Sequence, residues 1–396
     1  MSAGPARIYA DWNATAPLAV EVRDAMSEAL DGPFGNPSSA HAEGRRARDV
    51  LSAARRDVAR WLGARPSEVV FTSGATEALN HAITVLGSGH AVATAVEHSA
   101  VLEPIRAMER ARRLALTLVP VDDRGRLDPE QVATALRPET TLVAVMRANN
   151  ETGNLYDTLA VAQILRQRAP RATLLVDATQ AVGRIETSLD GLGADVVAVS
   201  AHKIGGPKGV GALVARGRPL DPLLRGGLQE SGRRAGTENL LGIVGLAAAA
   251  RLAPCVEHLV ALGQLLRREL DAAVPGLIVH GEPDASARLP QTTSVRFPGF
   301  DADSLLIRLD ALGVQLSAGS ACTSQTRAPS HVLSALGLSP EAAFETVRIS
   351  LGRTTSPEEV YELVARIARA VQLEREAVVA HRPKSLTSAQ RSRSTK

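Results

Sequence analysis

Cysteine and aromatic residues are scarce in this chain of 396 residues: it has two cysteines, and aromatic residues make up 3% of it. Two thiols are too few for a disulfide framework or a cysteine-based zinc site, and this content suits a reducing compartment. Few aromatics also disfavour nucleic-acid modules that stack bases on aromatic side chains. The first seven residues contain no apolar core of a signal peptide, and no uninterrupted apolar run reaches membrane-spanning length. We therefore expect a soluble, cytoplasmic protein.

The net charge of the chain is also small, and the basic residues that produce it are unevenly distributed. The formal net charge is +3, yet the stretch 381–396 holds five basic residues and no acidic one. Removing those five charges leaves −2 for the rest of the chain, so the basic isoelectric point is a property of the tail. Because this stretch is also rich in serine and threonine, we expect a disordered tail. The charge thus gives no support to direct nucleic-acid binding by the folded part.

Alternation of predicted strands and helices is the main pattern of the chain. Hydrophobic residues make up 45% of the sequence, which is enough for a large core. Between residues 69 and 215, short β-branched runs alternate with helical patterns, which predicts a mostly parallel sheet covered by helices. Later segments mix both patterns and predict a smaller α+β domain. The predicted fold class is therefore α/β, with a large domain over 14–254, a small domain formed by 1–13 and 255–380, and the tail 381–396.

Polar side chains follow five of the predicted strands, at the point where each strand ends. In a parallel sheet these carboxyl ends meet at one edge, where ligands bind. Each group also has a structural explanation, since serine, threonine, asparagine and aspartate often cap helices or shape turns. The coincidence of five at one edge favours a binding site. The groups are Ser73-Gly74-Ala75-Thr76, His98, Asn149-Asn150, Asp177 with Gln180, and Ser200-x-His202-Lys203.

The last of these groups carries the most specific chemistry. A buried apolar run, 196–199, leads to Lys203, and a segment rich in glycine and proline follows. A desolvated lysine loses its proton near neutral pH and can form a Schiff base, whereas a solvated turn lysine does neither. The turn at 72–77 opens a helix and predicts an anion site, although Thr76 could serve only as a helix cap. Together with a buried aspartate and a flat imidazole, these groups meet the requirements of pyridoxal phosphate.

Two residues in the second half have settings that are typical of a reactive site. Cys322 lies in a loop of small and hydroxyl-bearing residues, whereas a structural cysteine is normally buried among apolar side chains. This setting favours an exposed nucleophile over a tolerated surface cysteine. Arg348, within a predicted strand, is a candidate to bind a substrate carboxylate, or else an ordinary edge-strand arginine. Cys255 stands beside a proline at a helix boundary and is interpreted as a buried or incidental thiol.

The motifs taken together resemble those of the group I cysteine desulfurases. This group is the NifS/IscS branch of the class V aminotransferase family, among the fold-type I enzymes that use pyridoxal phosphate. The likeness extends from Ile8 to Arg353; each motif alone is modest, whereas their order is highly specific. The matching stretches are Gly35-Asn36-Pro37-Ser38-Ser39-x-His41, Thr72-Ser73-Gly74-Ala75-Thr76-Glu77, Glu97-His98, Asn149-Asn150-Glu151, Asp177-Ala178-Thr179-Gln180, Ser200-x-His202-Lys203-x-x-Gly206-Pro207-Lys208-Gly209, Gly236-Thr237 and Gly319-Ser320-Ala321-Cys322-Thr323-Ser324.

The resemblance implies a role in cofactor binding for ten residues. Lys203 would bind pyridoxal 5'-phosphate as a Schiff base, His98 would stack on its ring and help to move protons, and Asp177 would pair with the pyridine nitrogen. Gln180 would contact the ring hydroxyl, and Asn150 the cofactor or the substrate. The phosphate would be held by Ala75, Thr76, Ser200, His202 and, across the interface of a homodimer, Thr237.

The resemblance also implies the reaction. L-Cysteine would become L-alanine, with Asn36 and Arg348 binding the substrate carboxylate and Cys322 taking the sulfur as a persulfide. The persulfide would pass to an acceptor such as an iron–sulfur scaffold protein or a carrier for tRNA thiolation. No metal, membrane or direct nucleic-acid contact is implied. One departure from the family is Ala235, which stands where a serine is common and removes one possible hydrogen bond from the phosphate loop.

Other reactions on the same fold would use some of the same residues. An aminotransferase, a selenocysteine lyase or a kynureninase-like hydrolase would also need Lys203 and Asp177, but transamination needs no nucleophilic cysteine, so Cys322 favours desulfuration. The residues do not separate cysteine from selenocysteine as substrate. A non-catalytic member of the fold, acting as a regulator or complex subunit, is disfavoured because the lysine, the aspartate, His98 and the cysteine are all present.

Overall fold

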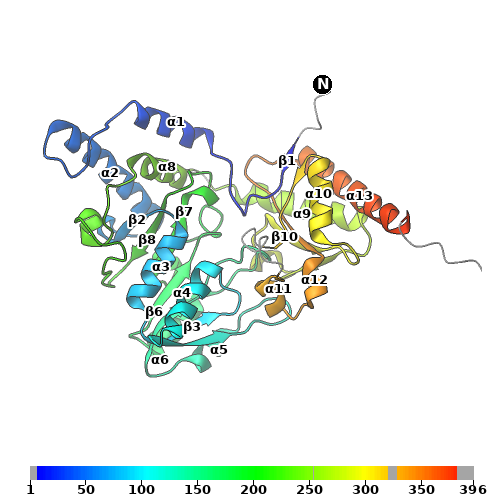
Figure 1. The fold of residues 1–396 in the computed structure, drawn as a ribbon, viewed down its shortest axis with the longest axis horizontal. Coiled ribbons are helices and arrows are strands. Elements are labelled where there is room, and N and C mark those ends of the chain that lie inside the picture. The colour runs from blue at the N-terminus through cyan, green and yellow to red at the C-terminus, as the bar shows by residue number, and fades with distance from the viewer. Residues whose placement is uncertain (1–6, 253, 320–327, 381–396) are drawn as a thin grey trace, which may run out of the picture.

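The larger part of the protein is built on a seven-stranded sheet. The computed structural model describes residues 7–252, 254–319 and 328–380 (Figure 1). The strand order is β2-β8-β7-β6-β5-β3-β4, and every neighbouring pair is parallel except the two that involve β8. The predicted mostly parallel α/β sheet is thus confirmed. The strands are β2 (Val69–Thr72), β3 (Gly89–Thr94), β4 (Leu114–Val119), β5 (Thr140–Ala144), β6 (Thr173–Asp177), β7 (Val196–Ser200) and β8 (Gly211–Ala215).

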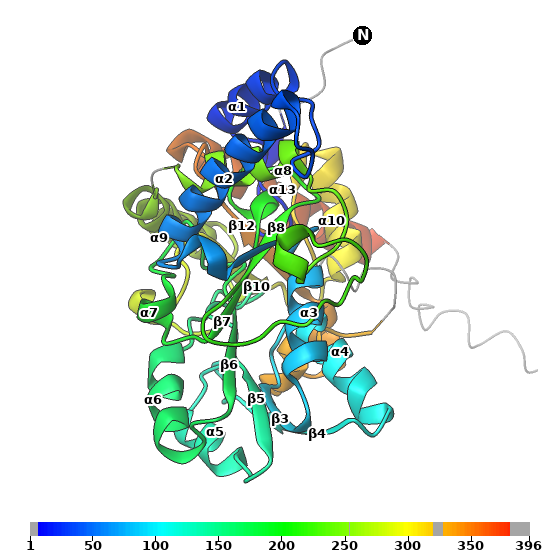
Figure 2. The same ribbon diagram turned by 90° about the vertical axis from the view of Figure 1, so that its left-hand side faces the viewer.

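Helices cover both faces of this sheet, which explains why its central strands are apolar without alternation. All five residues of β6 and of β7 are buried. Val197 and Val199 pack on one side against α2 and α6, while Val196 and Ala198 pack on the other against α3 and α4. Figure 2 shows the strands between these two groups of helices. The helices are α1 (Val20–Leu30), α2 (Ala42–Trp61), α3 (Ala75–Leu86), α4 (Ser99–Arg110), α5 (Pro129–Ala135), α6 (Thr158–Arg168), α7 (Leu189–Leu192) and α8 (Leu240–Ala250).

The second part of the chain forms its own apolar core around a three-stranded antiparallel sheet of order β12-β10-β9. A short parallel pair, β1 with β11, lies beside it. The boundaries proposed above for the two domains remain a prediction. The elements are β1 (Ile8–Tyr9), α9 (Val256–Ala273), β9 (Ile278–His280), β10 (Thr292–Arg296), α10 (Ala302–Ala311), β11 (Val314–Gln315), α11 (His331–Ala335), α12 (Pro340–Phe344), β12 (Thr346–Ser350) and α13 (Pro357–Ala380).

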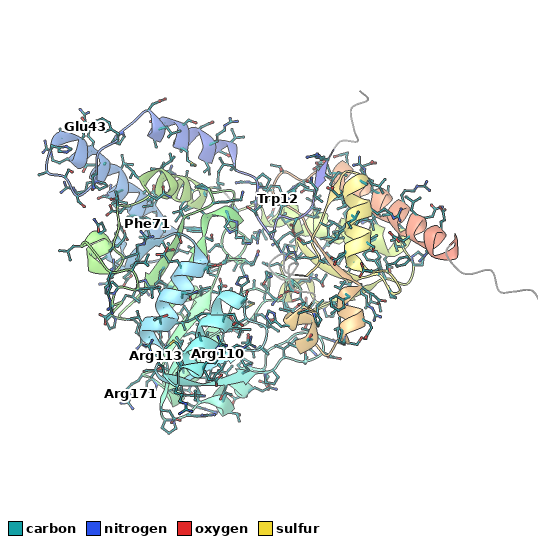
Figure 3. All side chains as sticks on the ribbon, viewed as in Figure 1. Trp12, Glu43, Phe71, Arg110, Arg113 and Arg171 are labelled. Carbon is teal, nitrogen blue, oxygen red and sulfur yellow. The ribbon has the colours of Figure 1, made fainter. Side chains whose placement is uncertain are left out.

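The N-terminal segment joins the two parts. Ile8 pairs with Val314, and the backbone N–H of Trp12 donates to the carbonyl of Ser350 at the end of β12. Gly352 leaves room for the indole, because a Cβ at that position would stand 1.8 Å from the Trp12 ring. Figure 3 labels Trp12 at the junction between the two sheets. The chain after it therefore runs directly to the carboxyl edge of the large sheet.

Two further expectations concern membrane-spanning segments and the residues outside the described ranges. No helix within the described ranges is long and apolar enough to cross a membrane. The tail 381–396 lies outside the described residues, as does the loop position of Cys322.

Candidate active site

All five strand ends that carry polar groups open into one cavity. Its volume is about 230 Å³, and it lies at the carboxyl edge of the parallel strands. The N-terminal loop and β12 complete its wall. The lining residues are Asn13, Ala14, Ala75, Leu79, His98, Ala100, Met146, Ala148, Asn150, Asp177, Thr179, Gln180, Ser200, His202, Lys203 and Arg348.

Lys203 enters the cavity from a single turn of 3-10 helix, Ala201–Lys203, that follows β7. Its Nζ donates to the backbone carbonyls of Asn13 at 2.7 Å and Ala14 at 2.8 Å. Two carbonyl acceptors from the N-terminal loop thus fix the position of the amine. The predicted strand that delivers a lysine at its tip is present, and the lysine is placed in the cavity by a segment 190 residues earlier in the chain.

Asp177 is the last residue of β6, and its side chain is almost enclosed, with 8% of the residue exposed. One carboxylate oxygen accepts from the backbone N–H of Thr179 at 2.9 Å. The hydroxyl of Thr179 is buried in the cavity wall and has no hydrogen-bond partner within the described part of the chain. Gln180, on the same turn, donates to the carbonyl of Asn13 and accepts from the buried Arg184 at 2.6 Å.

His98 caps the start of α4 and is held as a neutral ring. Its Nδ1 accepts from the backbone N–H of Ala100 at 3.1 Å, so the proton of the neutral imidazole is on Nε2. Burial lowers the pKa of His98; Lys203 and His331 lower it further, while Asp177 opposes them. The imidazole is therefore available near neutral pH as a flat uncharged ring with one N–H to donate.

The start of α3 forms the end of the site that can bind an anion. Gly74 stands at its N-cap, and no described side chain caps the first turn, so its backbone N–H groups are available to an anion. β8 passes close behind this turn, and a Cβ at Gly211 would stand 2.7 Å from the Gly74 Cα. Ser200 is buried at the same end of the cavity. Burial, with Lys203 and Lys208 nearby, lowers the pKa of His202 to about 4.

Arg348 occupies the side of the cavity that the second sheet supplies. It is 2% exposed, and it donates to the Asp11 carboxylate at 2.8 Å and to the carbonyl of Asn150 at 3.1 Å. Its Nε is buried without a partner within the described residues. The Nε–H is thus a donor that no acceptor in the described part of the chain uses.

Three residues of the predicted set lie outside the cavity wall of the single chain. Thr76 and Thr237 are exposed, the second on the loop that precedes α8. Asn36 is also exposed, and its side-chain oxygen accepts from the backbone N–H of Ser38 at 2.9 Å. Their roles stay predictions. Within the described residues, no cluster of histidine, cysteine, aspartate and glutamate could hold a metal ion.

The sequence model described as Aminotransferase class-V matches residues 8–363. The chain belongs to this family. Within it, cysteine desulfurases are close relatives: the Cereibacter sphaeroides enzyme is 42% identical over 369 residues, which cover 90% of this chain and 94% of the relative. The cysteine desulfurase IscS of Dictyoglomus turgidum is 39% identical over 365 residues, which cover 89% of this chain and 91% of that one.

A solved structure of a NifS-like protein superposes with a TM-score of 0.85 at 34% identity, and it covers 93% of this chain and 100% of the other. The resemblance inferred from the motifs is thus confirmed: this class V aminotransferase lies among the NifS- and IscS-like cysteine desulfurases.

Sequence reasoning missed one wall of the site in this class V aminotransferase. Asn13 lines the cavity, donates to the hydroxyl of Thr292 at 2.9 Å and leaves its side-chain oxygen buried without a partner within the described part. Asp11 holds Arg348, and Thr15 meets His202 with 3.2 Å between hydroxyl oxygen and Nδ1. The polar stretch 11–17, which follows the first strand, could have signalled this wall, because binding residues lie disproportionately often on loops.

Proposed function

We propose that this protein is a pyridoxal-phosphate-dependent cysteine desulfurase that converts L-cysteine into L-alanine and takes the sulfur on Cys322. The supporting observation is the single cavity that joins Lys203, Asp177, His98 and Arg348 in a chain whose relatives are cysteine desulfurases. Each side chain has a separate task in such a reaction, and an aminotransferase-like scaffold without this reaction would not need a reactive cysteine.

The residues of the cavity fit pyridoxal phosphate. Two buried polar atoms in the wall, the Asn13 side-chain oxygen and the Thr179 hydroxyl, have no partner within the described residues and can serve a polar ligand. Lys203 would hold the cofactor covalently and Asp177 would pair with its ring nitrogen. When bound, the cofactor supplies an electron sink for bonds broken at the substrate. Further contacts would come from Gln180 and Asn150 to the ring, and from Ala75, Thr76, Ser200 and His202 to the phosphate.

The chain's own groups would bind the substrate and move its protons. Arg348 would bind the carboxylate of cysteine through its free donor, assisted by Asn36. The amine of Lys203 would carry the proton between substrate carbons, which is general acid–base work. The neutral His98 ring would lie against the cofactor and exchange a proton through Nε2.

Cys322 would then accept the sulfur. Its thiolate attacks the substrate sulfur, the carbon–sulfur bond breaks and a sulfur–sulfur bond forms on the enzyme. The hydrogen lost by the Cys322 thiol ends on the β-carbon of alanine, so atoms and electrons balance without an external oxidant or reductant. Support for this role comes from the relatives and from the small, hydroxyl-rich sequence around the cysteine.

We also place the protein in the cytoplasm as a homodimer that passes sulfur to a scaffold or carrier protein. The dimer is supported by exposed apolar side chains around α1 and the loop before α8: Leu30, Phe34 and Leu228 are 70%, 88% and 85% exposed. A second subunit that covers these side chains would remove their apolar surface from water. Thr237, on the same loop, would reach the phosphate of the other subunit.

Incubation of the purified holoenzyme with cysteine and dithiothreitol tests the proposed activity. We expect alanine and sulfide in equal amounts, because dithiothreitol reduces the persulfide and is itself oxidised to its disulfide. Conversion of cysteine into its keto acid, with transfer of the amino group to an added keto acid and no sulfide, would instead indicate an aminotransferase. A higher kcat/KM for selenocysteine than for cysteine would indicate a selenocysteine lyase.

Arg348→Lys is expected to weaken cysteine binding. Lysine keeps the charge but lacks the planar fork of donors that matches a carboxylate. Hydrogen bonds to a charged group contribute about 1.5–3 kcal/mol, so KM for cysteine should rise roughly 10- to 100-fold. The matched control is Arg296→Lys on the neighbouring strand β10, where the arginine pairs with Glu345 at 2.7 Å away from the cavity. Equal KM values in the two variants would contradict the assignment of Arg348.

A further inference from the structure

Glu151 is a buried carboxyl group that the proposed reaction does not use. It follows the asparagine pair at the end of β5 and is 1% exposed. The hydroxyl of Ser330 donates to its Oε2 at 2.6 Å. Burial raises the pKa of Glu151, while Ser330, His331 and Arg348 counteract this effect. Burying this carboxyl group costs folding free energy that apolar side chains in place of Glu151 and Ser330 would not cost. Its presence there therefore calls for a reason other than stability.

The position of this carboxyl group relates it to Cys322. Gly319 lies next to it, since a Cβ at that position would stand 3.4 Å from Oε2, and the Ser330 hydroxyl donates to the same oxygen. These two residues precede and follow the stretch 320–327, which contains Cys322 and lies outside the described residues. One side chain therefore contacts the chain on both sides of the cysteine.

Neighbouring contacts connect the same two points to the wall of the active site. Before Gly319, the backbone N–H of Arg348 donates to the carbonyl of Ser317 at 2.7 Å. After Ser330, the Nε2 of His331 donates to the carbonyl of Glu97 at 2.8 Å, and Glu97 directly precedes His98. The chain before Cys322 is thus hydrogen-bonded to the backbone of Arg348, and the chain after it to the backbone of Glu97, the residue that precedes His98.

We propose that Glu151 and Ser330 are positioning residues that fix both ends of the cysteine-bearing stretch against the cavity, and so set where Cys322 meets the substrate sulfur. Glu151 touches neither cofactor nor substrate in this role; it acts through the chain. The inference rests on the proposed desulfurase function and adds a requirement to it. Because a reacting atom misplaced by 1 Å can slow a reaction about 100-fold, the sulfur-transfer step should be the sensitive one.

The test measures sulfur transfer and cysteine binding separately in the full-length holoenzyme. In a single turnover without added thiol, mass spectrometry follows the gain of one sulfur on Cys322, and the cofactor absorbance follows cysteine binding. For Glu151→Ala and Ser330→Ala we expect persulfide formation to slow about 10- to 100-fold, with the cysteine dissociation constant changed less than about threefold. Glu151→Gln, whose amide oxygen can still accept from Ser330, should restore most of the rate.

Ser339→Ala is the matched control for Ser330→Ala. Both serines cap short helices, Ser330 by accepting from Leu333 and Ser339 by accepting from Ala342, but only Ser330 also contacts Glu151. The control should keep the wild-type rate. An unchanged rate in Ser330→Ala, or a Glu151→Gln variant as slow as Glu151→Ala, would overturn the proposal, and the serine variant decides the matter if Glu151→Ala fails to fold.

The outcomes also separate this inference from the function on which it rests. If the wild-type enzyme gains no sulfur on Cys322, the desulfurase mechanism itself is wrong. If the wild-type enzyme gains sulfur on Cys322 and the Glu151 and Ser330 variants do so at the same rate, only the positioning role is wrong.

Discussion

Replacing Lys203 by alanine is expected to abolish cysteine turnover and to leave the protein without a covalently held cofactor. No other lysine lines the described part of the cavity, and the Lys203 amine is already fixed there by the carbonyls of Asn13 and Ala14. A positioned proton-transfer group alone contributes up to about 10⁴-fold, so alanine formation should fall at least that far. The visible absorbance of the reconstituted protein and the rate of alanine formation measure the two effects.

Lys208→Ala is the matched control for this variant. It removes a lysine from the same turn, five residues later, but the side chain is exposed and does not line the cavity. We expect it to keep both the visible band and the activity. A normal visible band in Lys203→Ala would refute the assignment of the cofactor lysine, and loss of the band in Lys208→Ala would show that the wrong lysine had been chosen.

The part of the site that the sequence could predict is the part that follows from strand direction. The residues after β2, β3, β5, β6 and β7 were expected at one edge because parallel strands present their carboxyl ends together, and each of those strands contributes to the cavity. The reversed strand β8 was not expected. Its place depends on the close approach of Gly211 to Gly74, two glycines far apart in the sequence, and no periodic pattern records such a contact.

The remainder of the site depends on contacts between distant segments. Asn13 and Asp11 enter through the N-terminal loop, which reaches Lys203 and Arg348 across sequence separations of 190 and 337 residues. The pairing of Glu151 with Ser330 spans 179 residues. Thr237 and Asn36 show the opposite case, since motif resemblance predicts a role for them but the single chain does not bring them to the cavity.

The charge of the cavity is consistent with two anionic ligand groups. Burial lowers the pKa of both His98 and His202, so neither imidazole contributes positive charge near neutral pH. Arg348 therefore supplies a permanent positive charge on the second-sheet side, with one carboxylate, Asp11, already paired to it. At the other end, the start of α3 offers backbone N–H groups, which suit an anion such as the phosphate of the proposed cofactor. Under the proposed function, a substrate carboxylate and a cofactor phosphate would thus be bound by different groups at different ends of the cavity.

Replacing Cys322 by alanine should stop the reaction at a later stage than replacing Lys203. The variant is expected to keep the cofactor absorbance and to respond to added cysteine, because Lys203, Asp177 and Arg348 are unchanged. Sulfide production in the presence of dithiothreitol should fall at least about 100-fold, since covalent catalysis by the Cys322 thiolate is lost. Sulfide release and persulfide content, measured on the same sample as the absorbance, check this.

Cys255→Ala is the matched control, because it removes the other thiol of the chain. Cys255 is partly buried in a separate cavity of about 50 Å³ that also contacts Arg184 and Lys203. This variant should retain sulfide production. Full sulfide release from Cys322→Ala would disprove the persulfide mechanism, whereas a persulfide found on Cys255 would move the acceptor to the opposite side of Lys203. Since the lysine variant is expected to fail before cysteine is bound and the Cys322 variant after it, a defect in cofactor binding in the Cys322 variant would show that this cysteine does not have the role assigned to it.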